Sequence, residues 1–239
     1  SQSVALYLPS RDGTRLLAVP ETAELSLNRP TSQTLSELLL SHPGTETAAP
    51  LGGDVALRLS DTEAVEVSGR VATVSLAASA LRLSHEELFT VGQALANTLC
   101  QFGDLEYVNV LIAGVQPGLD IAATLPAGCF QRNTQESLGT LWARASAQKT
   151  ASRRAFTAAL YYPAAAGKGI LCEARTLALT DLDAPALIRA LLSALSAGPE
   201  ALPGAPSYPD LTAQLSAEPE VREEGGQRRA VLQFSEELN

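Results

Sequence analysis

The sequence predicts an α+β protein made of two small modules in tandem, each a mostly antiparallel sheet with two helices on one face, the second module truncated. Three observations carry this prediction. A segment repeats 154 residues later, strand and helix periodicities follow the same order in both copies, and the second copy lacks a last helix and strand. We place the first module in residues 1–114, a linker in 115–154 and the second module in 155–239.

The repeat is carried by the run ALYLP at residues 5–9, which returns as ALYYP at residues 159–163. The same offset places Gly13 on Gly167, and the register holds over about twenty positions without a gap. Each copy reads strand, turn, strand, with the glycine at the turn, where a positive φ favours glycine. The expected strands are residues 4–9 and 15–25 in the first copy, and 157–163 and 169–179 in the second.

A helix is predicted after the first hairpin, because three leucines recur there at helical spacing. They are Leu35, Leu38 and Leu39. Thr34 and Glu37 are placed as a capping box for this helix.

The helix predicted after the second hairpin has clearer boundaries. Asp183 is the expected N-cap and Pro185 lies in the first turn. An apolar face covers residues 187–195, and Gly198 followed by Pro199 ends the helix.

Each copy then returns to strands, and residues 71–76 have their counterpart in residues 230–234, with one face of each strand expected in a core. The first copy adds a second helix that begins with a capping box of Ser84 and Glu87. A strand at residues 107–113 closes the first module, whereas the second copy has no equivalent of this helix and strand. The apolar side of the second helix is formed by Leu88, Val91, Leu95, Leu99 and Phe102.

The linker is interpreted as a hairpin arm followed by a helix that begins at Asn133 and carries Leu138, Leu141 and Trp142. In one interpretation this helix is a spacer packed against both modules. In the other it takes the place of the missing second helix of the second copy, because the truncation would otherwise expose an apolar sheet face.

Composition excludes several classes of function. Hydrophobic residues make up 46% of the chain and charged residues 18%, as in globular proteins with real cores. A net charge of −9 argues against a nucleic-acid partner, which requires clustered Lys and Arg. No apolar run approaches the roughly 20 residues that cross a bilayer.

The cysteines and histidines do not form a recognisable catalytic or metal site. Cys100, Cys129 and Cys172 are odd in number and lack metal-type spacing. We expect Cys100 to be a buried apolar residue and Cys129 to be exposed and able to oxidise between chains. His85 begins the helix that carries Cys100, and fifteen helical residues separate the two by roughly 22 Å, too far for a dyad.

Other candidate residues have ordinary structural interpretations. His42 is expected at the C-terminus of the first helix, where the dipole favours it. Neighbouring glutamates at 86–87 and 236–237 point to different sides of a helix, so they do not form an acid and base pair. The glycine pairs at 52–53 and 225–226 are expected turns, outside the strand and helix context of a phosphate loop. A basic cluster in the linker is expected to be a solvated face, with docking of an acidic partner as the alternative; its members are Arg144, Lys149, Arg153 and Arg154.

The order of elements, with LYLP in the first strand and FTVGQALANTLCQF before YVNVLIAG, resembles the GerM domain of sporulation and germination proteins. In the first copy the resemblance rests on residues 6–9, 69–76 and 108–114, and on Gln93, Thr98, Gln101 and Phe102. In the second copy it covers residues 160–234. The match therefore implies two tandem GerM-like copies, the second incomplete.

The resemblance implies a fold similar to the ring-building motif of secretion-system components. It also implies a non-catalytic, extracytoplasmic lipoprotein of a Gram-positive bacterium, acting as an assembly factor in a sporulation or germination envelope complex. The implied partners are other envelope proteins, with self-association possible, no nucleic acid, and membrane contact only through an N-terminal lipid anchor outside this chain. No catalytic, cofactor-binding or metal-binding residues come with the family, so none are predicted.

Two other functions are compatible with a globular chain of this kind. A module that binds cell-wall ligands would require an aromatic-lined groove, and the sequence has only five Tyr, five Phe and one Trp. A hydrolase would require a dyad that the spacing of His and Cys does not provide.

Overall fold

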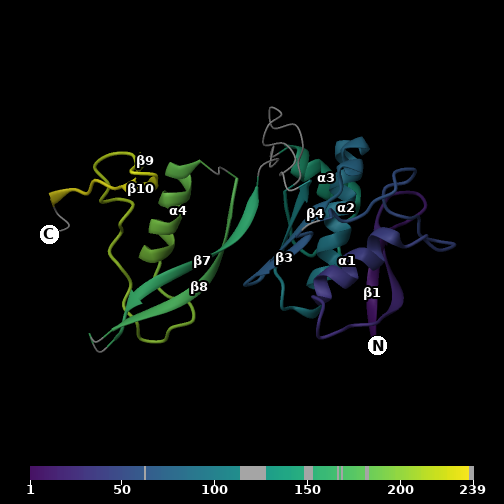
Figure 1. Cartoon of the computed structure of the whole chain (residues 1–239), viewed down its shortest axis with the longest axis horizontal. Helices are drawn as coiled ribbons and strands as arrows, with labels where there is room; N and C mark the ends of the chain where they lie inside the picture. The colour runs from purple at the N-terminus through teal and green to yellow at the C-terminus, as the bar shows by residue number, and fades with distance from the viewer. Residues whose placement is uncertain are drawn as a thin grey trace. The chain divides into compact units, whose positions relative to one another are not determined.

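The computed structural model contains two compact units, Ser1–Ala155 and Phe156–Asn239 (Figure 1). Small, mostly antiparallel sheets and α-helices alternate along the described chain, so the predicted α+β class is confirmed. The structure describes residues 1–61, 63–113, 128–147, 153–165, 167, 169–180 and 183–236.

The first unit begins with the predicted hairpin, formed by β1 (Gln2–Pro9) and β2 (Leu16–Ala23). The strands are antiparallel, and their register runs from Gln2 opposite Ala23 to Pro9 opposite Leu16. Gly13 lies at the turn with a φ of 70°, which confirms the role expected of this glycine.

A four-stranded sheet forms the other side of the first unit, in the order β3-β4-β5-β6. Only the β4–β5 pair is parallel, because α2 and two short 3₁₀ segments connect these strands and return the chain to the same end of the sheet. The elements are β3 (Val65–Ser68), β4 (Val71–Leu76), β5 (Tyr107–Ile112), β6 (Cys129–Phe130), η1 (Ala78–Arg82) and η2 (Cys100–Phe102).

The central element of the first unit is α2 (His85–Leu99), which contacts β1 as well as β5 and β6. Its predicted capping box is confirmed, since the Glu87 N–H donates to Ser84 Oγ at 3.2 Å and the Ser84 N–H donates to the Glu87 carboxylate at 2.7 Å. The prediction that Phe102 lies on the buried side is wrong, because Phe102 is 44% exposed. The helix ends at Leu99 and η2 turns the chain away.

The first predicted helix is α1 (Thr31–Ser41), which packs against α2. The capping box predicted for it is wrong, because the helix starts after Pro30 and Thr34 and Glu37 lie inside it. Pro30 is the N-cap residue, and since proline has no side-chain acceptor the helix begins without a side-chain cap. Glu37 instead bonds to Arg29.

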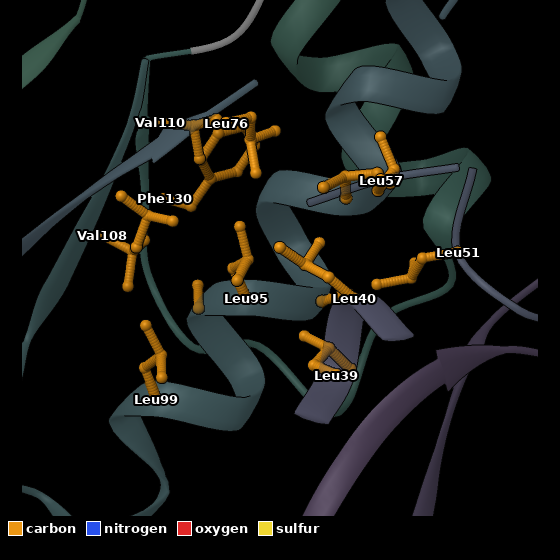
Figure 2. Close-up of a cluster of buried hydrophobic side chains, with 14 of the residues drawn as sticks. Leu39, Leu40, Leu51, Leu57, Leu76, Leu95, Leu99, Val108, Val110 and Phe130 are labelled. Carbon is orange, nitrogen blue, oxygen red and sulfur yellow. The ribbon is translucent and has the colours of Figure 1, made fainter. Parts of the chain in front are cut away.

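The core of the first unit joins helices and sheet into one cluster (Figure 2). Leucines of α1 and α2 meet valines of β5, and several of these side chains have less than 2% exposure. This apolar burial, at about 25 cal/mol per Å², is the main source of stability of the unit. Labelled members in Figure 2 include Leu39, Leu95, Leu99, Val108, Val110 and Phe130.

The linker helix is α3 (Leu138–Ala147), which begins five residues later than predicted. The Asn133 side chain accepts hydrogen bonds from the N–H groups of Gln135 and Glu136. This turn precedes the helix, which therefore begins further along the chain. Trp142 packs against Phe89 of α2, with ring centroids 5.5 Å apart, and Leu141 belongs to the first core. The hypothesis that this helix replaces a missing helix of the second copy is therefore wrong.

The predicted hairpin arm falls largely on residues 114–127, outside the described residues. Only its last part, β6, is described, where Phe130 pairs with Val108 of β5.

The second unit repeats the hairpin of the first, with β7 (Arg154–Pro163) and β8 (Ile170–Leu179). In the first turn the Ser10 N–H donates to the Arg15 carbonyl and the Gly13 N–H to the Ser10 carbonyl. The same two bonds return 154 residues later, from Ala164 to Gly169 and from Gly167 to Ala164, and Gly167 has a φ of 67°. The repeat therefore extends to the hydrogen bonds of the turn.

The helix after this hairpin is α4 (Ala184–Ser196), and its boundaries confirm the prediction. The Ala186 N–H donates to Asp183 Oδ1 at 2.8 Å, and Gly198 ends the helix region with a φ of 85°. The core of the second unit is much smaller than the first and centres on Ala158, Leu160, Tyr162 and Ala194.

The C-terminal strands of the second unit are β9 (Glu220–Glu224) and β10 (Gln227–Val231), which pair with each other. The expectation that residues 230–234 form a strand with one face in a core is not met, because β10 ends at Val231 and Val231, Leu232 and Phe234 are only half-buried. Charged side chains dominate both strands, and ion pairs such as Arg222–Glu220 and Arg229–Glu224 remain in solvent. Up to residue 236, no α-helix follows α4.

Candidate functional site

The histidines take structural positions. His85 is the first residue of α2 and Cys100 follows its last, so the whole helix separates them. His42 follows α1, as predicted, and its N–H donates to the Leu39 carbonyl. Its Nδ1 accepts the Gly44 N–H at 3.0 Å, and its Nε2 lies 3.5 Å from a Glu21 carboxylate oxygen.

The three cysteines differ in exposure. Cys100 is buried as expected, and loss of solvent raises the pKa of its thiol to about 12. Cys129 was expected to be exposed, and this is wrong, because it is half-buried in β6, where it pairs with β5, and burial raises the pKa of its thiol to about 11. Cys172 is exposed on β8.

Polar side chains of α2 and η2 bind the free edge of β1. The Tyr7 N–H donates to Thr98 Oγ1 at 3.1 Å, and the Ala5 N–H donates to Gln101 Oε1 at 3.0 Å. Gln101 Nε2 also donates to the Ala5 carbonyl. These are two of the residues on which the sequence resemblance rests, and their role is to satisfy the backbone of an edge strand.

The same helix holds the chain that precedes α3. Asn97 is fully buried, accepts the Asn133 N–H at 2.8 Å and donates to the Asn133 carbonyl at 2.8 Å. Gln93 donates to the carbonyl of Gln131 at 2.8 Å. The side chains of Gln93 and Asn97 thus bind the backbone of the segment before α3 and do not converge on a ligand site.

Asn109 of β5 forms a second backbone clamp, which the sequence analysis missed. Its Oδ1 accepts the Ala155 N–H at 2.9 Å and its Nδ2 donates to the Ala155 carbonyl at 2.7 Å. This pair of bonds fixes the end of the first unit. A lone Asn in the apolar run YVNVLI was the available signal, because a buried amide must find partners.

A buried ion pair in the second unit was also missed. Glu173 and Arg175 lie two residues apart on β8, so they point to the same face, and each is less than 10% exposed. The Arg175 guanidinium binds the Glu173 carboxylate and donates to the carbonyls of Ala194 and Gly198 at the end of α4. Opposite charges two apart in the apolar strand ILCEARTLAL were the signal.

The polar pocket is a cavity of about 350 Å³ beside the tip of the β1–β2 hairpin. Asn97 lies at its inner side, and the turn before α3 forms one wall. Polar groups dominate its lining: Thr14, Arg15, Asn97, Asn133, Thr134, Gln135, Glu136 and Ser137, with Leu16, Leu138 and Leu141.

The apolar pocket is a cavity of about 290 Å³ at the same hairpin tip. Its lining includes Pro9, Ala49, Pro50, Leu51 and Leu138, with Arg11 of the hairpin turn and Glu86, Glu87 and Thr90 of α2. Leu138, the first residue of α3, lines both pockets. A third pocket, of about 240 Å³, lies by Phe102 and the start of α1.

The remaining predicted features are ordinary contacts. Gly52 and Gly53 form a turn with positive φ, and Gly225 and Gly226 join β9 to β10, as predicted. Glu86 and Glu87 lie in the first turn of α2. No group of three His, Cys, Asp or Glu that could hold a metal occurs among the described residues. No helix in the same part of the chain is long and apolar enough to span a membrane.

The predicted basic cluster is divided between different contacts. Arg144 of α3 pairs with Glu136, and the Arg153 guanidinium carbon lies 5.9 Å from the centre of the Tyr107 ring. Arg154 is half-buried in β7, and Lys149 lies outside the described residues. Arg144 and Arg153 therefore both contact other residues of the first unit.

Residues 5–117 match the family model Germane, described as sporulation and spore germination. The first unit is a GerM-like domain. Among solved structures, the first GerMN domain of the sporulation protein GerM from Bacillus subtilis is 19% identical, covering 57% of this chain and 98% of its own, with a TM-score of 0.41. The tandem GerMN domains of the same protein are 17% identical, covering 97% of this chain and 78% of theirs, with a TM-score of 0.41. No curated protein matches the chain.

Proposed function

We propose that this GerM-like chain is a non-catalytic assembly protein of the bacterial envelope, acting through protein contacts in a sporulation or germination complex. The family description, sporulation and spore germination, supports the process. An extracytoplasmic position with an N-terminal lipid anchor is part of the same proposal, and so is binding to other envelope proteins.

One observation carries the proposal. The buried polar side chains of α2 and β5 bind the chain's own backbone, whereas the two pockets at the β1–β2 tip remain open. Neither of these two pockets is lined by His, Cys or an aromatic ring. A surface of this kind fits contact with another polypeptide better than acid–base chemistry or stacking of sugar rings.

The proposal is tested by photo-crosslinking from the hairpin tip in the source organism. A photo-reactive residue placed at Thr134 should give a discrete adduct with an envelope protein, and one placed at Arg82, which lines neither pocket, should not. Deletion of the gene should impair sporulation or germination. A chain with His42→Ala, His85→Ala and Cys172→Ser together should restore it. Failure of this triple variant, folded and present at normal levels, would indicate chemistry in place of assembly.

A further inference from the structure

The tip of the β1–β2 hairpin separates two pockets of opposite character. The polar pocket and the apolar pocket meet at Leu138, which lines both. The tip itself is rigid, because Asp12 Oδ1 accepts hydrogen bonds from Ser10 Oγ, the Thr14 N–H and Thr14 Oγ1. These bonds also lower the pKa of Asp12 to about 2, first through Ser10, so the turn keeps its charge at neutral pH. The site is therefore preformed.

The polar pocket has one guanidinium, that of Arg15, which the nearby Asp12 carboxylate, held by Ser10 and Thr14, contacts only electrostatically. Within the described part of the chain, the Arg15 guanidinium makes no hydrogen bond or ion pair. Glu136 lies in the same lining but is paired with Arg144 and accepts a bond from Asn133 at 2.7 Å. The Arg15 guanidinium is thus the charged group of this lining that can still donate to an anionic ligand, and the Thr134 and Gln135 side chains add neutral donors.

The backbone N–H groups at the N-terminus of α3 are not the groups that would bind an anion here. The Leu138 N–H already donates to the Thr14 carbonyl at 3.0 Å, and the Thr140 N–H donates to Ser137 Oγ at 3.2 Å. Recognition of an anion therefore depends on Arg15, which lies on the hairpin.

The apolar pocket presents the opposite sign at its rim. Glu86 and Glu87 of α2 line it and outnumber the one cation of the lining, Arg11, whose guanidinium donates to the Thr45 carbonyl. Gly52 keeps the wall compact, because a Cβ there would lie 2.7 Å from the Val55 carbonyl oxygen. An apolar side chain is accepted in this pocket, whereas a carboxylate is repelled by the glutamates.

We propose that these two pockets bind one extended segment of a partner protein, with an acidic side chain at Arg15 and an apolar side chain beside Leu51. Charge complementarity fixes the direction of the segment, because an acidic residue is favoured beside Arg15 and disfavoured beside the two glutamates of the apolar pocket. The inference rests on the proposed function and names the partner's chemistry at this surface. Aromatic side chains, on which sugar rings stack, are absent from both linings.

The test uses the full chain, labelled with ¹⁵N and in its Leu methyl groups, and two matched peptide series. The first is acetyl-Leu-Gly(n)-Asp-amide with n from 0 to 3, and the second has Asn in place of Asp. In the best Asp peptide, titration should shift the amide signals of Arg15 and Thr134 and a methyl signal of Leu51. The matched Asn peptide should bind about three- to fivefold more weakly, as expected for loss of one exposed ion pair.

Variants assign the effect to its cause. Arg15→Ala should abolish the preference for Asp over Asn, Arg15→Lys should retain most of it, and Arg82→Ala should leave it unchanged. An Ala peptide in place of the Leu peptide should bind more weakly and no longer shift Leu51. Equal binding of the Asp and Asn peptides, or saturable binding of N-acetylglucosamine oligomers at these residues, would overturn the inference. An envelope adduct at Thr134 without peptide selectivity refutes this inference alone, whereas selectivity without any envelope adduct refutes the proposed function alone.

Discussion

The ring of Phe130 in β6 packs so closely on Gly92 of α2 that no side chain fits at position 92. A Cβ at position 92 would lie 2.2 Å from Phe130 Cε2 and 2.3 Å from Cζ. The Phe130 ring also packs against Phe89 one turn earlier on the helix, at 5.5 Å between centroids. The glycine therefore lets the short strand β6 close over α2.

We expect Gly92→Ala to destabilise the first unit by about 1 to 3 kcal/mol, because Phe130 must leave its position. This cost exceeds the gain of up to about 1 kcal/mol from the better helix propensity of alanine. Urea unfolding followed by fluorescence of Trp142, the single tryptophan, reports on this unit because Trp142 packs on Phe89.

The matched control is Gly139→Ala in α3. No atom lies within 4 Å of a Cβ at this position, so the substitution should leave stability unchanged or raise it by up to about 1 kcal/mol. If both alanine variants have the same stability, the close approach of Phe130 does not exclude a side chain.

The bond from the Tyr7 N–H to Thr98 gives a second prediction. Thr98→Val keeps the shape of a fully buried side chain but leaves the Tyr7 N–H without its acceptor. An unsatisfied buried donor costs about 1 to 3 kcal/mol, and we expect the unfolding free energy of the first unit to fall by this amount. Hydrogen exchange at the Tyr7 amide should accelerate in the variant.

Thr90→Val on the same helix is its control. The Thr90 hydroxyl donates to the Glu86 carbonyl within α2, and no backbone N–H depends on it. We expect a change below about 0.5 kcal/mol and normal exchange at Tyr7. An equally large loss in the control would mean that removal of any threonine hydroxyl from α2, not loss of the acceptor at the edge of β1, determines the effect.

The elements that the sequence predicted well are those with strong local signals. The turn glycines, the capping box of Ser84 and Glu87 and the N-cap Asp183 depend on residues close in the chain, and all three are confirmed. The capping box predicted for α1 is wrong because the helix begins at Thr31, three residues before Thr34, with Pro30 as its N-cap.

Long-range contacts were not predictable from spacing alone. Asn109 finds its partner 46 residues away at Ala155, and Cys129 is covered through its pairing with β5. The segment at residues 230–234 shows the reverse error, since its apolar residues suggested a buried strand but the strand ends at Val231 and the apolar side chains are only half-buried. The pockets at the hairpin tip combine residues from distant segments, and no single motif encodes them.

Thiol labelling should distinguish the three cysteines. At pH 8, iodoacetamide should modify the folded chain once, at the exposed Cys172, because burial raises the pKa of Cys100 and Cys129 to about 12 and about 11. Mass spectrometry counts the adducts. Cys172→Ser should reduce the count to zero, and denaturant should raise that of the unmodified sequence to three. Rapid native labelling of Cys129 would contradict the burial of β6.

The buried pair of Glu173 and Arg175 gives a prediction for the second unit. Arg175→Met removes the guanidinium and leaves the Glu173 carboxylate buried without its ion-pair partner. We expect a loss of about 3 kcal/mol, the lower end of the range for breaking a buried pair, because Glu173 keeps two N–H donors at Glu200 and Ala201. Native-state hydrogen exchange of the Leu192 and Ala194 amides measures the loss in this unit. An equal loss in the first unit would contradict the division into two units.

The same carboxylate makes the second unit sensitive to acid. Burial acts to raise the pKa of Glu173, but the Ala201 N–H and the Arg175 guanidinium outweigh it, so the pKa lies below its usual value. A lowered pKa in the folded state means that the stabilisation is complete above the unfolded value of about 4.3 and is lost as pH falls through the folded value. Glu173→Gln should therefore be less stable than the unmodified chain at pH 7, and the difference should shrink below about pH 4. A difference that stays constant from pH 7 to pH 3 would mean that the shape of the side chain, not its charge, holds the end of α4.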